Sequence, residues 1–94
     1  MKRIYKYPLD NVDHQELRLP ANSKILSVET QDERIVLYAL VDDTVTHQNT
    51  HLIIIHGTGH NADDTTDCNF IGTVKLYSGA IMLHVFARGL LNDR

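Results

Sequence analysis

The chain has 94 residues, of which 43% are hydrophobic and 22% are charged, and its formal net charge is −3. This composition is typical of a globular protein, and the length predicts one domain over residues 1–94. The negative net charge argues against general binding of DNA. The single cysteine, Cys68, excludes an internal disulfide and a four-cysteine zinc site.

Apolar segments of the sequence are short. Purely apolar runs reach only four residues, as in LIII at 52–55, whereas about 20 residues are needed to span a membrane. The segment after Met1 reads KRIYKY, which lacks the apolar stretch of a secretory signal. We therefore expect a soluble protein in a reducing cytosol, without membrane contact.

Strand patterns dominate the chain from end to end. Alternating or β-branched apolar runs bounded by Pro, Gly and polar residues predict strands. These runs cover residues 3–9, 15–20, 23–30, 33–42, 51–57, 70–76 and 80–88. No segment keeps a helical period with caps. The sequence therefore predicts an all-β fold of about seven strands, as a small antiparallel barrel or sandwich.

Two of these runs carry more specific information. The run at 33–42 is apolar on both faces, which predicts a central strand. The last run places Met82, His84 and Phe86 on one face, and Leu83 and Val85 on the other. His84 thus interrupts an apolar strand. A buried imidazole needs a hydrogen-bond partner, so His84 is expected to be held by a neighbour or to face a pocket or subunit interface.

The connections also differ in kind. The residues TQDER at 30–34 predict a hairpin, and YSG at 77–79 predicts a tight turn with Gly79 at positive φ. The polar segment at 58–69 is about a dozen residues long. Loops of that length are uncommon in compact domains and are often functional.

The segment HLIIIHGTGH at 51–60 holds three histidines. His56 and His60 have the spacing of helical zinc ligands, with His84 as a conceivable third ligand, but the glycines between them argue against a helix. No metal site and no cofactor is therefore expected.

Catalysis is also disfavoured. His56, Thr58 and His84 resemble parts of a two-histidine phosphoesterase, but the second His-x-Thr element is missing. Cys68 lies in an acidic stretch that should raise the pKa of its thiol, which disfavours a nucleophilic role. We therefore expect a protein that is not an enzyme.

Anion binding fits the same stretch better. Gly57 and Gly59 allow the backbone to approach a ligand closely and to present its amides, while Thr58 and His60 add donors. Tyr7 is a candidate for stacking on a base, and Lys6 for charge pairing. For each of these residues, a structural role as turn, surface or core is the competing interpretation.

Blocks of the sequence resemble a family of small bacteriophage proteins. These blocks are MKRIYKYPL, KILSVETQDERIVLYALVD, HGTGH, FIGTV and LHVF, and they span nearly the whole chain. The family resembles the anti-CBASS sponges, which bind cyclic dinucleotide immune signals without cleaving them and work as small oligomers with ligands at subunit interfaces. The resemblance implies an anti-defence protein in the host cell cytoplasm that forms a dimer or tetramer.

The ligand contacts expected from residue chemistry come from three blocks. The candidate ligand-binding residues are Lys6, Tyr7, Gly57, Thr58, Gly59, His60 and His84. The acidic segment NADDTTD at 61–67 should point away from a dianionic ligand, because like charges repel. Two alternatives remain open: a structural or protein-interaction accessory module of phage origin, and a small phosphodiesterase.

Overall fold

The computed structural model describes residues 1–90 and confirms the all-β class. Seven strands and one short 3-10 helix, η1, follow each other along the chain. Their bounds are β1 Lys2–Leu9, β2 His14–Pro20, β3 Lys24–Gln31, β4 Arg34–Asp42, β5 Gln48–Gly57, η1 Asp63–Thr65, β6 Asn69–Leu76 and β7 Ile81–Gly89. Among residues 1–90, no helix is long and apolar enough to cross a membrane.

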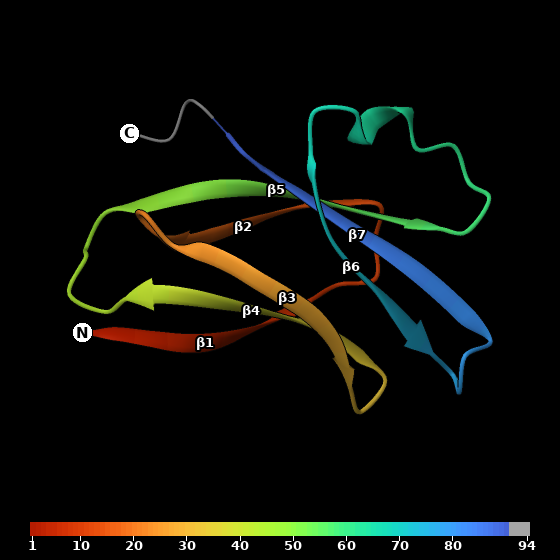
Figure 1. Cartoon of the computed structure of the whole chain (residues 1–94), viewed down its shortest axis with the longest axis horizontal. Coiled ribbons are helices and arrows are strands. Elements are labelled where there is room, and N and C mark those ends of the chain that lie inside the picture. Colours follow the sequence, from red (N-terminus) through yellow and green to blue (C-terminus); the bar gives the residue numbers. More distant parts are fainter. Residues whose placement is uncertain (91–94) are drawn as a thin grey trace.

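The strands form two antiparallel sheets that lie face to face (Figure 1). One sheet has the order β1-β4-β3, and the other has the order β2-β5-β7-β6. The sheets do not close into a barrel, so of the two predicted folds, barrel and sandwich, the chain adopts the sandwich. The strand β4 is central in its sheet, as its two apolar faces predict.

The core lies between the sheets and follows the strand alternation. On β5 the inward residues Ile53 and Ile55 are at most 2% exposed, and on β7 the inward residue Val85 is fully buried. His56 and His84 stand opposite each other on the outer face of the four-stranded sheet. The predicted assignment of faces on the last strand is therefore confirmed.

Residues with positive φ form the turns of the two hairpins, β3–β4 and β6–β7. Asp32 and Glu33, between β3 and β4, have φ of 52° and 62°, the combination that a two-residue type I′ turn requires. Between β6 and β7, Gly79 has φ of 89°, as predicted. The amide of Tyr77 donates hydrogen bonds to both carboxylate oxygens of Glu33, at 3.1 and 2.9 Å. The two hairpin ends are thereby linked.

The edge strands β3 and β6 bring the two sheets together on one side. A β-carbon on Gly72 would lie 3.0 Å from Val28 Cγ2, so the strands can approach this closely only because Gly72 has no side chain. Each strand also has a bulge, between Ile25 and Ser27 in β3 and between Phe70 and Gly72 in β6. The bulges end the region of close approach, and a cleft opens beyond them.

The loop 58–68, which contains η1, lies on the outer face of the four-stranded sheet. Its Asp64 contacts His14 of β2 and His56 of β5, both on that face. Ile54 pairs with His14 in the register and precedes His56 by two residues on β5; it is only 1% exposed although it points away from the core between the sheets. The loop thus provides a second small buried region.

Candidate functional site

The predicted glycine turn follows β5 and reverses the chain toward the loop. The His60 amide donates a hydrogen bond to the Gly57 carbonyl oxygen at 3.2 Å, and Gly59 has φ of 86°, which favours glycine. The His60 ring lies against Gly57, because a β-carbon there would be 3.0 Å from His60 Cε1. The amides of Thr58 and Gly59 take no part in the turn's hydrogen bond.

A shallow cavity of about 430 Å³ lies beside this turn. Gly57, Thr58 and His60 form one side of it, and residues 80–83 at the start of β7 form the other. Ile81 is 38% exposed in this cavity. The site therefore combines a polar turn with an apolar wall.

His84 lies next to the turn and is held by two threonines. Its Nε2 is 2.7 Å from Thr58 Oγ1, and its Nδ1 is 2.9 Å from Thr73 Oγ1. A neutral imidazole donates from one nitrogen and accepts at the other, so one hydroxyl accepts and the other donates. The need of His84 for a partner is thus met, and Thr58 and His84 form one unit.

His56 is 9% exposed and is held by the loop. Its Nε2 is 2.7 Å from Asp64 Oδ1, and His14 Nε2 is 2.7 Å from Asp64 Oδ2. The two rings lie edge to face, with centroids 6.2 Å apart. The hydrogen bond from His56, with a second one from His14, holds the pKa of Asp64 below its usual value. The acidic segment at 61–67 is therefore attached to the sheet through the hydrogen bonds of Asp64 with His14 and His56.

This histidine group does not have the arrangement of a metal centre. Within the described part of the chain, no three side chains of His, Cys, Asp or Glu are placed to hold a metal ion. Cys68 is half-buried, and desolvation and the nearby Asp67 raise the pKa of its thiol, in the direction that the acidic stretch predicts.

Lys6 and Tyr7 lie on β1, in the other sheet. Lys6 Nζ donates a hydrogen bond to Gln31 Oε1 at 2.7 Å, and Tyr7 packs against the core between the sheets. Burial raises the pKa of the Tyr7 hydroxyl. Neither residue lines the cavity beside the turn. Within one chain, the structure brings together Gly57, Thr58, Gly59, His60 and His84, and leaves these two residues apart.

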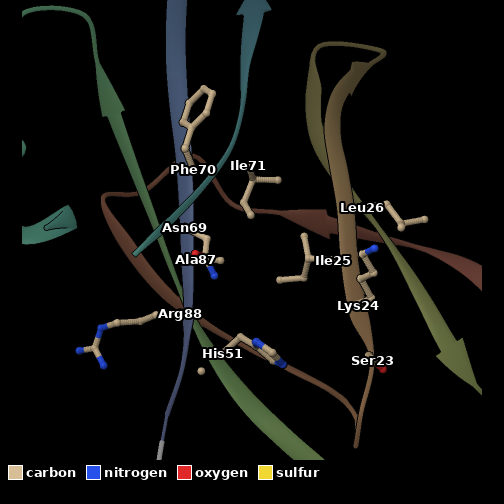
Figure 2. A pocket seen from close by; sticks show the side chains of 11 residues that line it. Ser23, Lys24, Ile25, Leu26, His51, Asn69, Phe70, Ile71, Ala87 and Arg88 are labelled. Atoms are coloured by element: carbon tan, nitrogen blue, oxygen red, sulfur yellow. The ribbon is translucent and has the colours of Figure 1, made fainter. Parts of the chain in front are cut away.

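The cleft beyond the bulges is a second candidate site, which the sequence did not reveal. It measures about 450 Å³ and is lined by residues 23–26 at the start of β3, 69–71 of β6, 87–89 of β7 and His51 of β5. Figure 2 shows Ile25, Ile71 and Ala87 around the cleft and His51 extending toward β3, whereas the Arg88 guanidinium points away. Gly72, an isolated glycine in a predicted strand, was the available signal for an irregularity here.

Comparisons with known proteins identify the family to which the chain belongs. Comparison with curated proteins gives no match, and comparison with solved structures gives none either. One family model, described as a domain of unknown function (DUF7352), matches residues 1–93. Since this match covers almost every residue, the chain belongs to the DUF7352 family.

Proposed function

We propose that this protein binds a cyclic dinucleotide and sequesters it without cleaving it, as a phage anti-defence protein acting in the cytoplasm of the host. The observation that carries the proposal is the turn 57–60, whose glycine-dependent conformation stands beside a cavity of about 430 Å³. The resemblance of the KRIYKYPL, GTGH and HVF blocks to anti-CBASS sponges supplies the class of ligand.

Recognition begins with the phosphates. The Thr58 and Gly59 amides and the His60 ring are donors that can serve phosphate oxygens, and hydrogen bonds to a charged oxygen are stronger than neutral ones. Ile81 and Met82 line the opposite side of the cavity, where they offer an apolar surface to a base or ribose.

The environment of the histidines supports binding rather than cleavage. Hydrolysis of a phosphodiester by two histidines needs one imidazole as base and another as acid. His84 has both ring nitrogens hydrogen-bonded to threonines, and His56 is buried against Asp64. Neither His56 nor His84 lines the cavity beside the turn.

A complete site requires more than one copy of the chain. The cavity is shallow, whereas small-ligand sites typically bury 70–90% of their ligand. Lys6 and Tyr7 lie on the other sheet, so they reach a ligand at the turn only from another subunit. A dimer or tetramer is therefore part of the proposal, and measurement of the solution mass by light scattering tests it: a strict monomer would contradict the shared site.

A second candidate function is that of a protein-interaction module. Ile4 on the edge strand β1 is 62% exposed, and Tyr5 beside it is 41% exposed. An edge strand with exposed apolar side chains is suited to pairing with a partner strand. This alternative predicts a protein partner and no nucleotide retention.

The decisive experiment incubates the protein with a panel of cyclic dinucleotides, removes free nucleotide, and analyses by chromatography what the denatured protein releases. We expect intact ligand. Cleaved product would establish the phosphodiesterase alternative, and no retained nucleotide would refute sequestration.

Variants then locate the site. The double variant Thr58→Val/His60→Ala removes the His60 ring from the phosphate and the Thr58 hydroxyl from His84. It should weaken binding roughly 10- to 100-fold, the loss expected for one hydrogen bond to a charged group. The control Thr46→Val/His47→Ala alters the same residue types in the exposed connection before β5 and should bind normally. Equal affinity of the two folded variants would exclude the turn as the site.

A further inference from the structure

The strand β1 has one open edge. Among residues 1–90 it pairs only with β4, so it ends its sheet on one side (Figure 1). The Asp43 amide donates a hydrogen bond to the Met1 carbonyl oxygen at 3.0 Å, in register with the pairing of Lys2 and Asp42. Bonded pairs alternate along an antiparallel ladder, so the odd-numbered residues of β1 bond to β4. The even-numbered residues therefore direct their amides and carbonyls to the open edge.

A proline limits the part of this edge that can pair. Pro8 is one of the even-numbered residues, and it has no amide hydrogen to offer to a further strand. The open edge thus presents both an amide and a carbonyl only at Lys2, Ile4 and Lys6. Lysines and prolines on an edge strand disfavour unselective pairing. A strand that pairs with β1 must therefore match this short stretch.

Apolar side chains are exposed on the same stretch. Met1, Ile4 and Tyr5 are 69%, 62% and 41% exposed. Ile4 lies on the outer face of its sheet, whereas Tyr5 alternates with it and lies on the same face as the buried Leu9. Tyr5 stays exposed because β1 makes its extensive contacts with β4 alone. Both faces and the edge of β1 are thus open over the same residues, which suits a strand that another strand continues.

A second copy of the chain fits this edge best in one register. Two β1 strands related by a two-fold axis pair antiparallel, and the even-numbered residues then oppose each other. An axis at Ile4 places Lys2 directly opposite the partner's Lys6, and an axis at Lys6 places the two copies of this residue opposite each other. Like charges in such positions are destabilising. An axis at Tyr5 keeps the lysines apart and still pairs the whole of β1.

We infer that β1 pairs with β1 of a second copy of this chain around a two-fold axis at Tyr5, which joins the two three-stranded sheets into one continuous sheet. Ile4 lies opposite the partner's Lys6, and the two exchange amide–carbonyl hydrogen bonds. The aliphatic part of the lysine covers the exposed Ile4 side chain. The two Tyr5 rings meet at the axis as a cross-strand aromatic pair.

The inference goes beyond the proposed function, because this pairing requires no nucleotide. The turn 57–60 follows β5 in the four-stranded sheet, and that sheet takes no part in the contact between the two β1 strands. The paired stretch is short, so the contact belongs to the small end of the range of protein interfaces. The dimer should therefore form reversibly and depend on protein concentration.

Disulfide trapping in nucleotide-free protein tests the register. Opposite residues of a non-hydrogen-bonded antiparallel pair have Cα atoms about 4.5 Å apart, within the range of about 4.4–6.8 Å that a disulfide spans. In a Cys68→Ser background, Tyr5→Cys should therefore give a covalent dimer under mild oxidation. The control is Ile4→Cys, whose two copies lie diagonally, about 7–8 Å apart, and should not be bridged. Trapping of Ile4→Cys instead of Tyr5→Cys, or of neither, would overturn the inference.

Analytical ultracentrifugation over a range of concentrations measures the pairing itself. Tyr5→Lys removes the aromatic pair and places two ammonium groups at the axis, so it should weaken the dimer at least about 10-fold. Tyr77→Lys makes the same substitution at a tyrosine that is 57% exposed between β6 and β7, and it should dimerise as the unaltered protein does. Equal dimerisation of the two folded variants would exclude β1 as the contact.

Hydrogen exchange identifies the bonded amides. The amides of Ile4 and Lys6 should be protected in the concentrated unaltered protein and should exchange rapidly in Tyr5→Lys, whereas the amide of Tyr7, which bonds to β4, should be protected in both. Rapid exchange of Ile4 and Lys6 in a dimeric sample would show that the copies meet elsewhere, and would overturn the inference. Loss of nucleotide retention with the β1 contact intact would contradict sequestration alone.

Discussion

His56 and Asp64 are eight residues apart in the chain, and their side chains meet at 2.7 Å on the outer face of the four-stranded sheet. The other carboxylate oxygen of Asp64 is 2.7 Å from Nε2 of His14. One carboxylate thus connects β2, β5 and the loop 58–68. The long polar connection is attached to the sheet through this group.

We expect the stabilising effect of Asp64 to depend on pH. Hydrogen bonds from His56 and His14 lower its pKa in the folded protein, so its contribution is complete above the unfolded pKa of about 3.9 and is lost as the pH falls through the lower folded pKa. The difference in thermal midpoint between the unaltered protein and Asp64→Asn should therefore be larger at pH 6 than at pH 2.5.

The matched control is Asp63→Asn, which removes the neighbouring carboxylate without touching either histidine bond. A pH-independent difference for Asp64→Asn, or an equal pH dependence for both variants, would contradict the role given to Asp64.

Gly72→Ala should destabilise the sandwich by about 1–3 kcal/mol, the usual cost of overpacking. The new β-carbon would lie 3.0 Å from Val28 Cγ2, where β6 packs against β3. Chemical denaturation measures the change. Gly89→Ala serves as the control, because nothing lies within 4 Å of its added carbon. Restoration of part of the loss by Val28→Ala in the double variant would identify the contact, and full stability of Gly72→Ala would disprove it.

Ile54→Ala should lower the free energy of unfolding by about 2–5 kcal/mol, as for a fully buried core residue. Ile54 is 1% exposed, although it lies on the outer face of its sheet. Ile4→Ala removes the same atoms from a position that is 62% exposed and should change stability by less than about 0.5 kcal/mol. Similar small effects for both variants would show that the outer face is not packed.

Thr73→Val should release one ring nitrogen of His84. The hydroxyl of Thr73 lies 2.9 Å from Nδ1, and its loss should cost about 1 kcal/mol or less at this partly exposed position. The chemical shift of Nδ1 of His84 should move, because this nitrogen loses its hydrogen-bond partner, whereas that of Nε2 should move less. Lys75→Ala, two residues along the same strand, should leave both shifts unchanged; an unaltered Nδ1 shift in Thr73→Val would contradict the threonine pair.

The sequence predicts the strands well, because alternation records which face each side chain occupies. The alternation at 80–88 assigns both faces of β7 correctly. The two apolar faces at 33–42 identify β4 as the central strand of its sheet. The choice between barrel and sandwich depends on which edge strands pair. No local pattern in β1 or β2 determines that pairing.

The sequence predicts only part of the candidate site. Gly57 and Gly59 predict the turn because backbone freedom is a local property, and His84 required a partner that proved to be Thr58 and Thr73. Lys6 and Tyr7 had no local signal to tell which sheet they join. The cleft was missed because bulges at 26 and 71 break the alternation on which strand prediction depends.

The shared carboxylate of Asp64 makes His14 and His56 a pair of natural reporters. Any event that lifts the loop from the sheet removes the same acceptor from both rings at once. Their resonances should therefore change together and at one rate, so that the detachment of this loop can be timed without attaching a label.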